Sequence, residues 1–137
     1  RTTDGGDSWE ENIRYGESMP SNLTFTDPLH GWYVSNTNDT TRVMLKTTDG
    51  GKTWESLPFL PPYELIEFLG FSDPQNGWMV RVYGAPLSPG FVYKTKDGGK
   101  TWELAHTMNY LNKLVFPDKK TVYGGGYMNL VKFILEE

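Results

Sequence analysis

The chain has no cysteine among its 137 residues, and it also lacks long apolar runs and clusters of positive charge. Without cysteine there are no disulfides, no thiolate metal sites and no thiol nucleophile. No apolar run approaches the roughly 20 residues that span a bilayer, so no transmembrane segment is predicted in this stretch. A net charge of -4 without a basic cluster argues against nucleic acid as a partner.

Helical periodicity is also missing, whereas turn-forming and aromatic residues are plentiful. The 15 glycines and 9 prolines favour short elements joined by turns. A hydrophobic fraction of 37%, with 15% aromatic residues, is enough for a packed core in one domain. The segment ELIEFLG at 64–70 is ambiguous by itself, but its place in the repeat described next predicts a strand.

An eight-residue motif occurs three times, at intervals of about 45 residues. It reads TTDGGDSW at 2–9, TTDGGKTW at 47–54 and TKDGGKTW at 95–102. Such a period indicates a repeat architecture with one supersecondary unit in each repeat.

A second motif lies out of phase with the first. FTDPLHGWYV at 25–34 returns as FSDPQNGWMV at 71–80. A weaker copy, FPDKKTVYGG at 116–125, has Tyr123 where Trp32 and Trp78 stand in the other two. Each repeat therefore carries two separate signatures.

Each repeat also contains about four extended segments. From Asn22 onward, the short β-rich runs are NLTFTD, GWYVSN, RVMLKTT and KTWESL. Asp27-Pro28 and Asp49-Gly50-Gly51 between them are turn signals. Four antiparallel strands in about 45 residues are typical of one propeller blade. The sequence therefore predicts an all-β fold, a β-propeller of four-stranded antiparallel blades.

The pattern Ser/Thr-x-Asp-x-Gly-x-Ser/Thr-Trp resembles the Asp-box, or bacterial neuraminidase repeat, of sialidase-type β-propellers. Its residues here are Asp4, Gly6, Trp9, Asp49, Gly51, Trp54, Asp97, Gly99 and Trp102. Together with the second motif, it resembles the photosystem II stability and assembly factor family and its relatives in bacteria that do not photosynthesise. We expect a structural role, in which the aspartate accepts hydrogen bonds from loop N–H groups and hydroxyls above a buried tryptophan.

We interpret residues 1–137 as a single propeller segment of about three blades. Blade repeats are expected at about 22–59, 64–106 and 109–137, with the last completed by residues 1–14. Three blades are too few for a ring, since propellers have roughly 4 to 8. The segment is therefore either part of a longer chain with further blades or half of a six-bladed ring made by a homodimer. The first alternative is favoured, because the sequence starts in mid-blade without methionine.

The resemblance implies that the Asp-box turns lie at the outer edge of the blades and that a ligand site lies on the opposite, central face. The loops expected on that face are 36–41, 58–64 and 83–90. The candidate ligand-binding residues in or beside them are Arg42, Arg81, Tyr63 and Tyr83. We expect the ligand to be a protein or a carbohydrate.

The enzymatic alternative is a glycoside hydrolase of the sialidase or xyloglucanase type, with its catalytic groups in further blades. Sialidase chemistry needs an arginine triad, a tyrosine nucleophile supported by a glutamate, and an acid. The arginines here are scattered, at Arg1, Arg14, Arg42 and Arg81. A glycosidase also needs two carboxylates that flank the scissile bond. The possible ones here are Asp39, Glu64 and Glu67, and their spacing does not single out a pair.

The sequence thus favours a non-catalytic scaffold or binding module. We assign no catalytic residues and no cofactor. We also assign no metal ligands, because His30 and His106 have no ligand-spaced companions. The bacterial relatives that the resemblance implies are often exported, so a periplasmic or extracellular location, including the cell surface, is expected.

Overall fold

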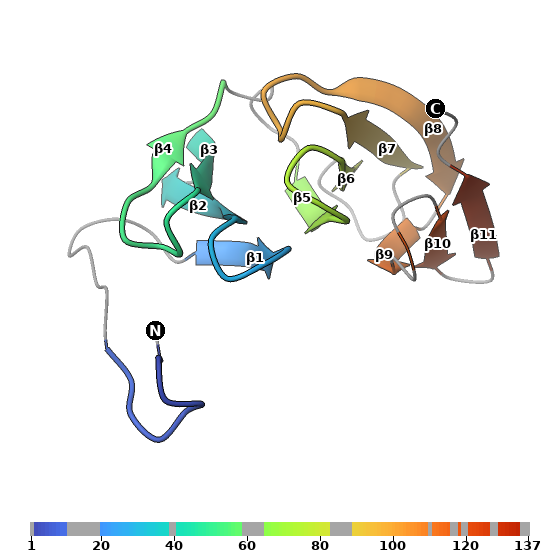
Figure 1. Ribbon diagram of the computed structural model, residues 1–137. Coiled ribbons are helices and arrows are strands. Elements are labelled where there is room, and N and C mark those ends of the chain that lie inside the picture. The colour runs from blue at the N-terminus through green and yellow to red at the C-terminus, as the bar shows by residue number, and fades with distance from the viewer. Residues whose placement is uncertain are drawn as a thin grey trace.

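The computed structural model describes residues 2–10, 20–38, 41–58, 65–82, 89–109, 111–115, 118, 121–126 and 129–134. Within these ranges the secondary structure is all β, and the strands form three antiparallel sheets (Figure 1). This confirms the predicted all-β fold class. No helix in this part of the chain is long and apolar enough to cross a bilayer.

The three sheets follow one another along the chain. The first has the order β1-β2-β3-β4, with strands Pro20–Phe25, Gly31–Asn38, Thr41–Thr47 and Glu55–Ser56. The second has the order β5-β6-β7-β8, with strands Leu65–Phe71, Gly77–Val82, Pro89–Thr95 and Glu103–Asn109. The third has the order β11-β10-β9, with β9 at Leu111–Val115, β10 at Thr121–Gly126 and β11 at Asn129–Ile134.

The strand register repeats from sheet to sheet. Trp32 is opposite Thr24 in the first sheet, Trp78 is opposite Gly70 in the second, and Tyr123 is opposite Val115 in the third. Because each partner directly precedes the Phe of the second motif, the two tryptophans and Tyr123 occupy equivalent positions. At this position the weak third copy of the motif is therefore equivalent to the other two.

The sheets stand side by side as blades of a propeller arc. The first strands pack against one another, β1 against β5 and β5 against β9, and they lie on the inner side of the arc, with β4 and β8 on the outer side (Figure 1). Asn22 lies in a bulge of β1 with a φ of 54, and its Nδ2 donates to the carbonyl oxygen of Ile66 in β5 (3.0 Å). This bond ties the inner edges of the first two sheets together.

Two apolar clusters fill the spaces between adjacent sheets. The cluster between the first and second sheets consists of Trp32, Val34, Met44, Leu57, Leu69, Phe71 and Met79. The cluster between the second and third consists of Trp78, Val80, Val92, Leu114 and Val122. Since adjacent sheets bury the sides that face each other, the stability of the arc rests on contacts between successive sheets.

Residues 2–10 belong to none of the three described sheets. They form an Asp-box loop that lies apart from the sheets (Figure 1). The blade boundaries given above, and the completion of the third blade by residues 1–14, stay predictions.

Asp-box loops and the candidate ligand face

Each Asp-box is a loop whose polar groups bond to one another. In the loop at 95–102, the Thr95 hydroxyl donates to Asp97 Oδ1 (2.8 Å) and accepts from the Gly99 N–H (3.0 Å). The Asp97 carboxylate also accepts from the N–H and the hydroxyl of Thr101. The loops at 2–9 and 47–54 have the same bonds. The aspartate thus closes the hairpin by satisfying donors inside it.

The same hydrogen bonds lower the pKa of the loop aspartates. Burial raises the pKa of Asp97, but the hydrogen bonds from Thr101 and Thr95 outweigh it and bring the pKa to about 2. For Asp4 and Asp49, the hydroxyl of the Ser or Thr at the loop end is the largest cause of a pKa well below the usual range. Carboxylates of this kind stay ionised at neutral pH and are poor proton donors.

Both glycines of the Asp-box are required by its backbone. Gly98 and Gly99 have φ values of 73 and 92, and the glycine pairs of the other two loops are also in the left-handed region. A Cβ on Gly98 would lie 2.8 Å from the carbonyl oxygen of Pro74. The Asp-box pattern specifies only the second of these two glycines. The first glycine is also present in all three copies, and this repetition already indicated that the loop needs glycine there.

The Asp-box tryptophans lie against their own loops and are less buried than the sequence suggested. The indole N–H of Trp102 donates to the carbonyl oxygen of Gly99 (3.1 Å), and that of Trp9 donates to Gly6 (3.1 Å). Trp102 is half-buried, whereas Trp9 is 69% exposed. The fully buried tryptophans are those of the second motif, because they lie between sheets.

Trp32 connects the first sheet to the Asp-box of the second. Its ring stacks on Phe71 with a centroid distance of 3.8 Å and an interplanar angle of 7°, and its indole N–H donates to the carbonyl oxygen of Gly98 (3.0 Å). The buried Lys46 places its ammonium 5.5 Å from the Trp32 ring. The Asp-box is therefore also a contact between sheets, which local sequence patterns did not predict.

The turn of the second motif has its own closed set of bonds. Asp27 Oδ1 accepts from the N–H groups of Leu29 (2.8 Å) and His30 (3.0 Å), and His30 Nδ1 lies 2.8 Å from Asp27 Oδ2. The Leu29 bond, followed by those of His30, lowers the Asp27 pKa against the opposing effect of burial. In the second sheet, Asn76 Nδ2 binds Asp73 in the same way. The Asp27 and His30 pair therefore stabilises the turn.

Of the candidate ligand residues, Arg42 and Arg81 lie toward the end of the sheets opposite the Asp-boxes. Because the strands alternate in direction, the β2–β3 and β6–β7 connections are on the other side from the β3–β4 and β7–β8 connections that hold the Asp-boxes. Arg42 is the second residue of β3, close to the first of these connections, and is half-buried. Arg81, near the end of β6, is 2% exposed, and its guanidinium carbon lies 4.9 Å from the Tyr93 ring centroid.

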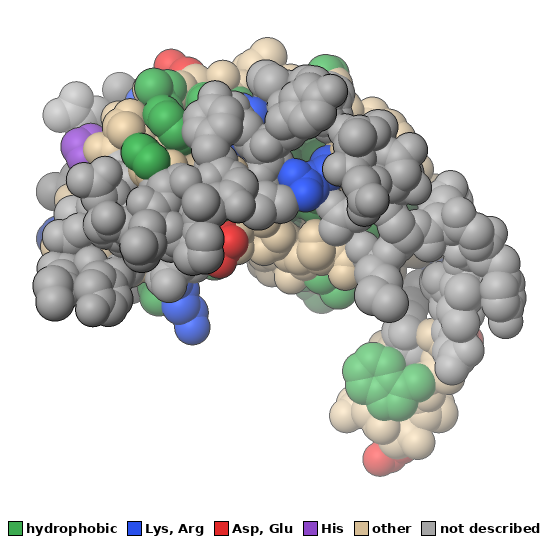
Figure 2. Space-filling model, turned by 180° about the vertical axis from the view of Figure 1, so that it is seen from behind, with side chains coloured by type: hydrophobic (Ala, Val, Ile, Leu, Met, Phe, Trp, Pro, Cys, Tyr) green, Lys and Arg blue, Asp and Glu red, His purple; other side chains and the backbone are tan. Residues whose placement is uncertain are grey.

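The other proposed positions are only partly covered by the structure. Tyr63 and Tyr83 lie outside the described residues, as do Asp39 and Glu64, whereas Glu67 is exposed on β5. Figure 2 shows charged side chains of both signs scattered over the described part of one face. Within the described ranges, no group of His, Asp or Glu side chains could hold a metal ion.

A family model described as photosynthesis system II assembly factor YCF48 matches residues 5–114. The chain belongs to this family. A curated relative, the photosystem II assembly lipoprotein Ycf48 of Picosynechococcus sp., is 45% identical over 47 residues, which cover 34% of this chain and 13% of that protein.

A solved structure, YCF48 bound to D1 peptide, has the same fold. It matches with a TM-score of 0.58 at 21% sequence identity, over 92% of this chain and 43% of that chain. The match confirms the predicted β-propeller architecture. The chain spans less than half the length of either relative.

Proposed function

We propose that this chain is a non-catalytic part of a β-propeller that binds a peptide segment of a partner protein. The observation that carries the proposal is the match of residues 5–114 to the assembly-factor family, whose solved relative is bound to a D1 peptide. A protein partner is preferred to a carbohydrate, because both relatives are named for assembly or for a bound peptide. The same match favours binding over glycoside hydrolysis.

The proposed binding face is the one that carries Arg42 and Arg81. The Asp-box end of the sheets is a poor candidate, because its carboxylates and hydroxyls are engaged within the loops. Arg42 is half-buried at the margin of this face and supplies a guanidinium for a peptide carboxylate or carbonyl group. Arg81 is buried against Tyr93, so its proposed role is to hold the strands of this face in place. Tyr63 and Tyr83 remain proposed contacts.

We also propose that the protein acts on the periplasmic or extracellular side of a membrane. The support is the curated relative, which is named a lipoprotein. A lipid anchor would hold such a propeller at the membrane surface, where a membrane protein's exposed segments are within reach.

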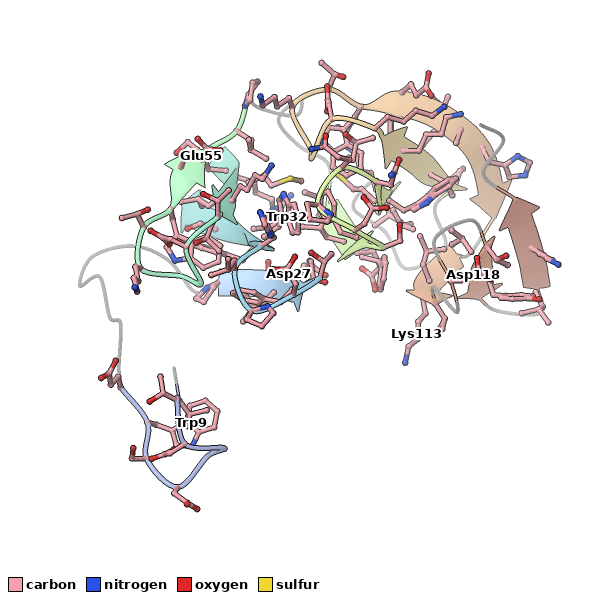
Figure 3. The ribbon with its side chains drawn as sticks, in the orientation of Figure 1. Trp9, Asp27, Trp32, Glu55, Lys113 and Asp118 are labelled. Carbon is pink, nitrogen blue, oxygen red and sulfur yellow. The ribbon has the colours of Figure 1, made fainter. Side chains whose placement is uncertain are left out.

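Calorimetric titration with a synthetic D1 peptide tests the proposal. We expect the wild-type chain to bind and Arg42→Gln to raise the Kd about tenfold, the size of one lost charge-assisted hydrogen bond. Lys113→Gln is the matched control, because it removes one positive charge from an exposed side chain on β9 in the third sheet (Figure 3). Failure of the wild type to bind, or equal loss in the two variants, would contradict the proposal.

A further inference from the structure

The first strand of each described sheet carries a β-bulge near its start, on the inner side of the arc (Figure 1). In β5 the pairing with β6 skips Glu67, and in β9 the pairing with β10 skips Asn112 at the equivalent place. In β1 the shift of register includes Asn22. Because bulges redirect side chains and are common beside binding sites, the bulged residues are candidates for recognition.

The bulge in β5 directs Glu67 toward the inner side of the arc. Residues two apart in a regular strand share a face, yet Ile66 packs against the cluster between the first and second sheets, and Phe68 packs against the cluster between the second and third. Glu67 between them is exposed. Since β5 is the edge strand of its sheet on the inner side of the arc, the Glu67 carboxylate extends from that edge. None of the described residues forms a hydrogen bond or an ion pair with it.

Asn22 of the first sheet places a second acceptor beside Glu67. Its Nδ2 donates to the carbonyl oxygen of Ile66 (3.0 Å), which belongs to the peptide group that joins Ile66 to Glu67. Since a carbonyl oxygen only accepts, the amide nitrogen of Asn22 must face it, and the amide oxygen Oδ1 is left for another donor. Asparagine is one of the few residues that tolerate the left-handed φ of 54 found here. Asn22 and Glu67 together therefore present oxygen acceptors at one point of the inner edge.

These two residues lie toward the same end of the sheets as the proposed binding face. Ile66, directly before Glu67, is paired with Arg81 across β5 and β6. Arg42 lies toward this end in the first sheet. The face thus has a guanidinium at Arg42 and a carboxylate at Glu67, at separate positions.

We propose that Glu67 and Asn22 bind a basic side chain of the peptide segment that this face receives. The inference rests on the proposed peptide-binding function and adds a specificity to it. A lysine ammonium or an arginine guanidinium has only donors, and the carboxylate of Glu67 and the Oδ1 of Asn22 are matching acceptors. With Arg42 on the same face, this site selects a segment in which a basic residue accompanies an acidic or carbonyl group, and it disfavours a wholly acidic segment.

A lysine scan of the synthetic D1 peptide tests the inference. Each position of the peptide is replaced in turn by lysine or by its uncharged analogue norleucine, and calorimetric titration gives the Kd. With the wild-type protein, we expect lysine to lower the Kd about threefold relative to norleucine at one or two neighbouring positions, the size of an exposed ion pair. Glu67→Gln should abolish this difference. Glu55→Gln is the matched control and should keep it, because Glu55 is an exposed carboxylate on β4, on the outer side of the arc (Figure 3).

A second variant tests the part played by Asn22. Asn22→Gly should reduce the lysine difference without removing it, because glycine adopts the same φ but has no amide oxygen to accept from the ammonium. A full lysine difference in this variant would overturn the role of Asn22.

The outcomes of the scan separate this inference from the proposed function. If the parent D1 peptide binds but no position distinguishes lysine from norleucine, the inference is overturned and the function stands. A lysine difference that persists in Glu67→Gln, or that is lost equally in Glu55→Gln, overturns it in the same way. A wild type that binds none of the peptides overturns both.

Discussion

Trp32 is the residue in which the two sequence motifs meet. It belongs to the second motif, yet its indole donates to Gly98 in the Asp-box of the next sheet. Trp32 therefore joins the second motif of one sheet to the Asp-box of the next in a single contact. At the scale of the residue, both motifs therefore have structural roles.

Replacement of Trp32 tests this contact. Trp32→Phe keeps an aromatic ring beside Phe71 but removes the donor to the Gly98 carbonyl oxygen. We expect the free energy of unfolding to fall by about 1 to 3 kcal/mol, because a buried acceptor loses its partner. Urea denaturation measures the change, with the exposed Leu104→Ala variant expected within about 0.5 kcal/mol of wild type. Wild-type stability of Trp32→Phe would show that the bond contributes nothing.

Asp97 makes the stability of the protein depend on pH. Folding lowers its pKa from 3.8 to about 2, so its ionised form stabilises the fold above pH 3.8, and this contribution is lost as the pH falls toward 2. Asp97→Asn removes the charge at every pH. We expect wild type to be the more stable at neutral pH and the difference to shrink through this range, as measured by urea midpoints. A difference that stays constant down to pH 2 would contradict the assignment.

At the scale of the element, the turn between the first two strands of a sheet is a self-contained unit. His30 in the first sheet and Asn76 in the second each bind the aspartate three residues earlier. His30→Asn should therefore leave the melting temperature unchanged, whereas His30→Ala should lower it, because it removes the bond to Asp27. Thermal unfolding followed by circular dichroism measures both. A large loss in His30→Asn would point to a role for the imidazole beyond the turn.

The strands and turns were predictable from the sequence because their determinants are local. Alternating β-rich runs, Asp-Gly-Gly hairpins and the repeat period predicted four-stranded sheets, and the ambiguous segment at 64–70 is indeed strand β5. The bond from Trp32 to Gly98 and that from Asn22 to Ile66 were not predicted, since they join positions in different sheets and leave no local pattern. The burial of Arg81 against Tyr93 was also missed, because it depends on how β6 pairs with β7 within the second sheet.

At the scale of the whole molecule, the Asp-boxes and the proposed binding face lie at opposite ends of the strands. The Asp-boxes close hairpins and join sheets at one end of the strands, and the connections beside Arg42 and Arg81 lie at the other. This division would let the connections on the proposed binding face vary without loss of the repeat. The proposed peptide site and the Asp-boxes should therefore respond to a ligand independently.

The most direct test is a map of amide chemical shifts during titration with the synthetic D1 peptide. We expect the perturbed amides to cluster around Arg42 and Arg81, while the Asp-box loops at 47–54 and 95–102 stay unchanged. Perturbations centred on the Asp-box loops, or none at saturating peptide, would contradict the proposed binding face.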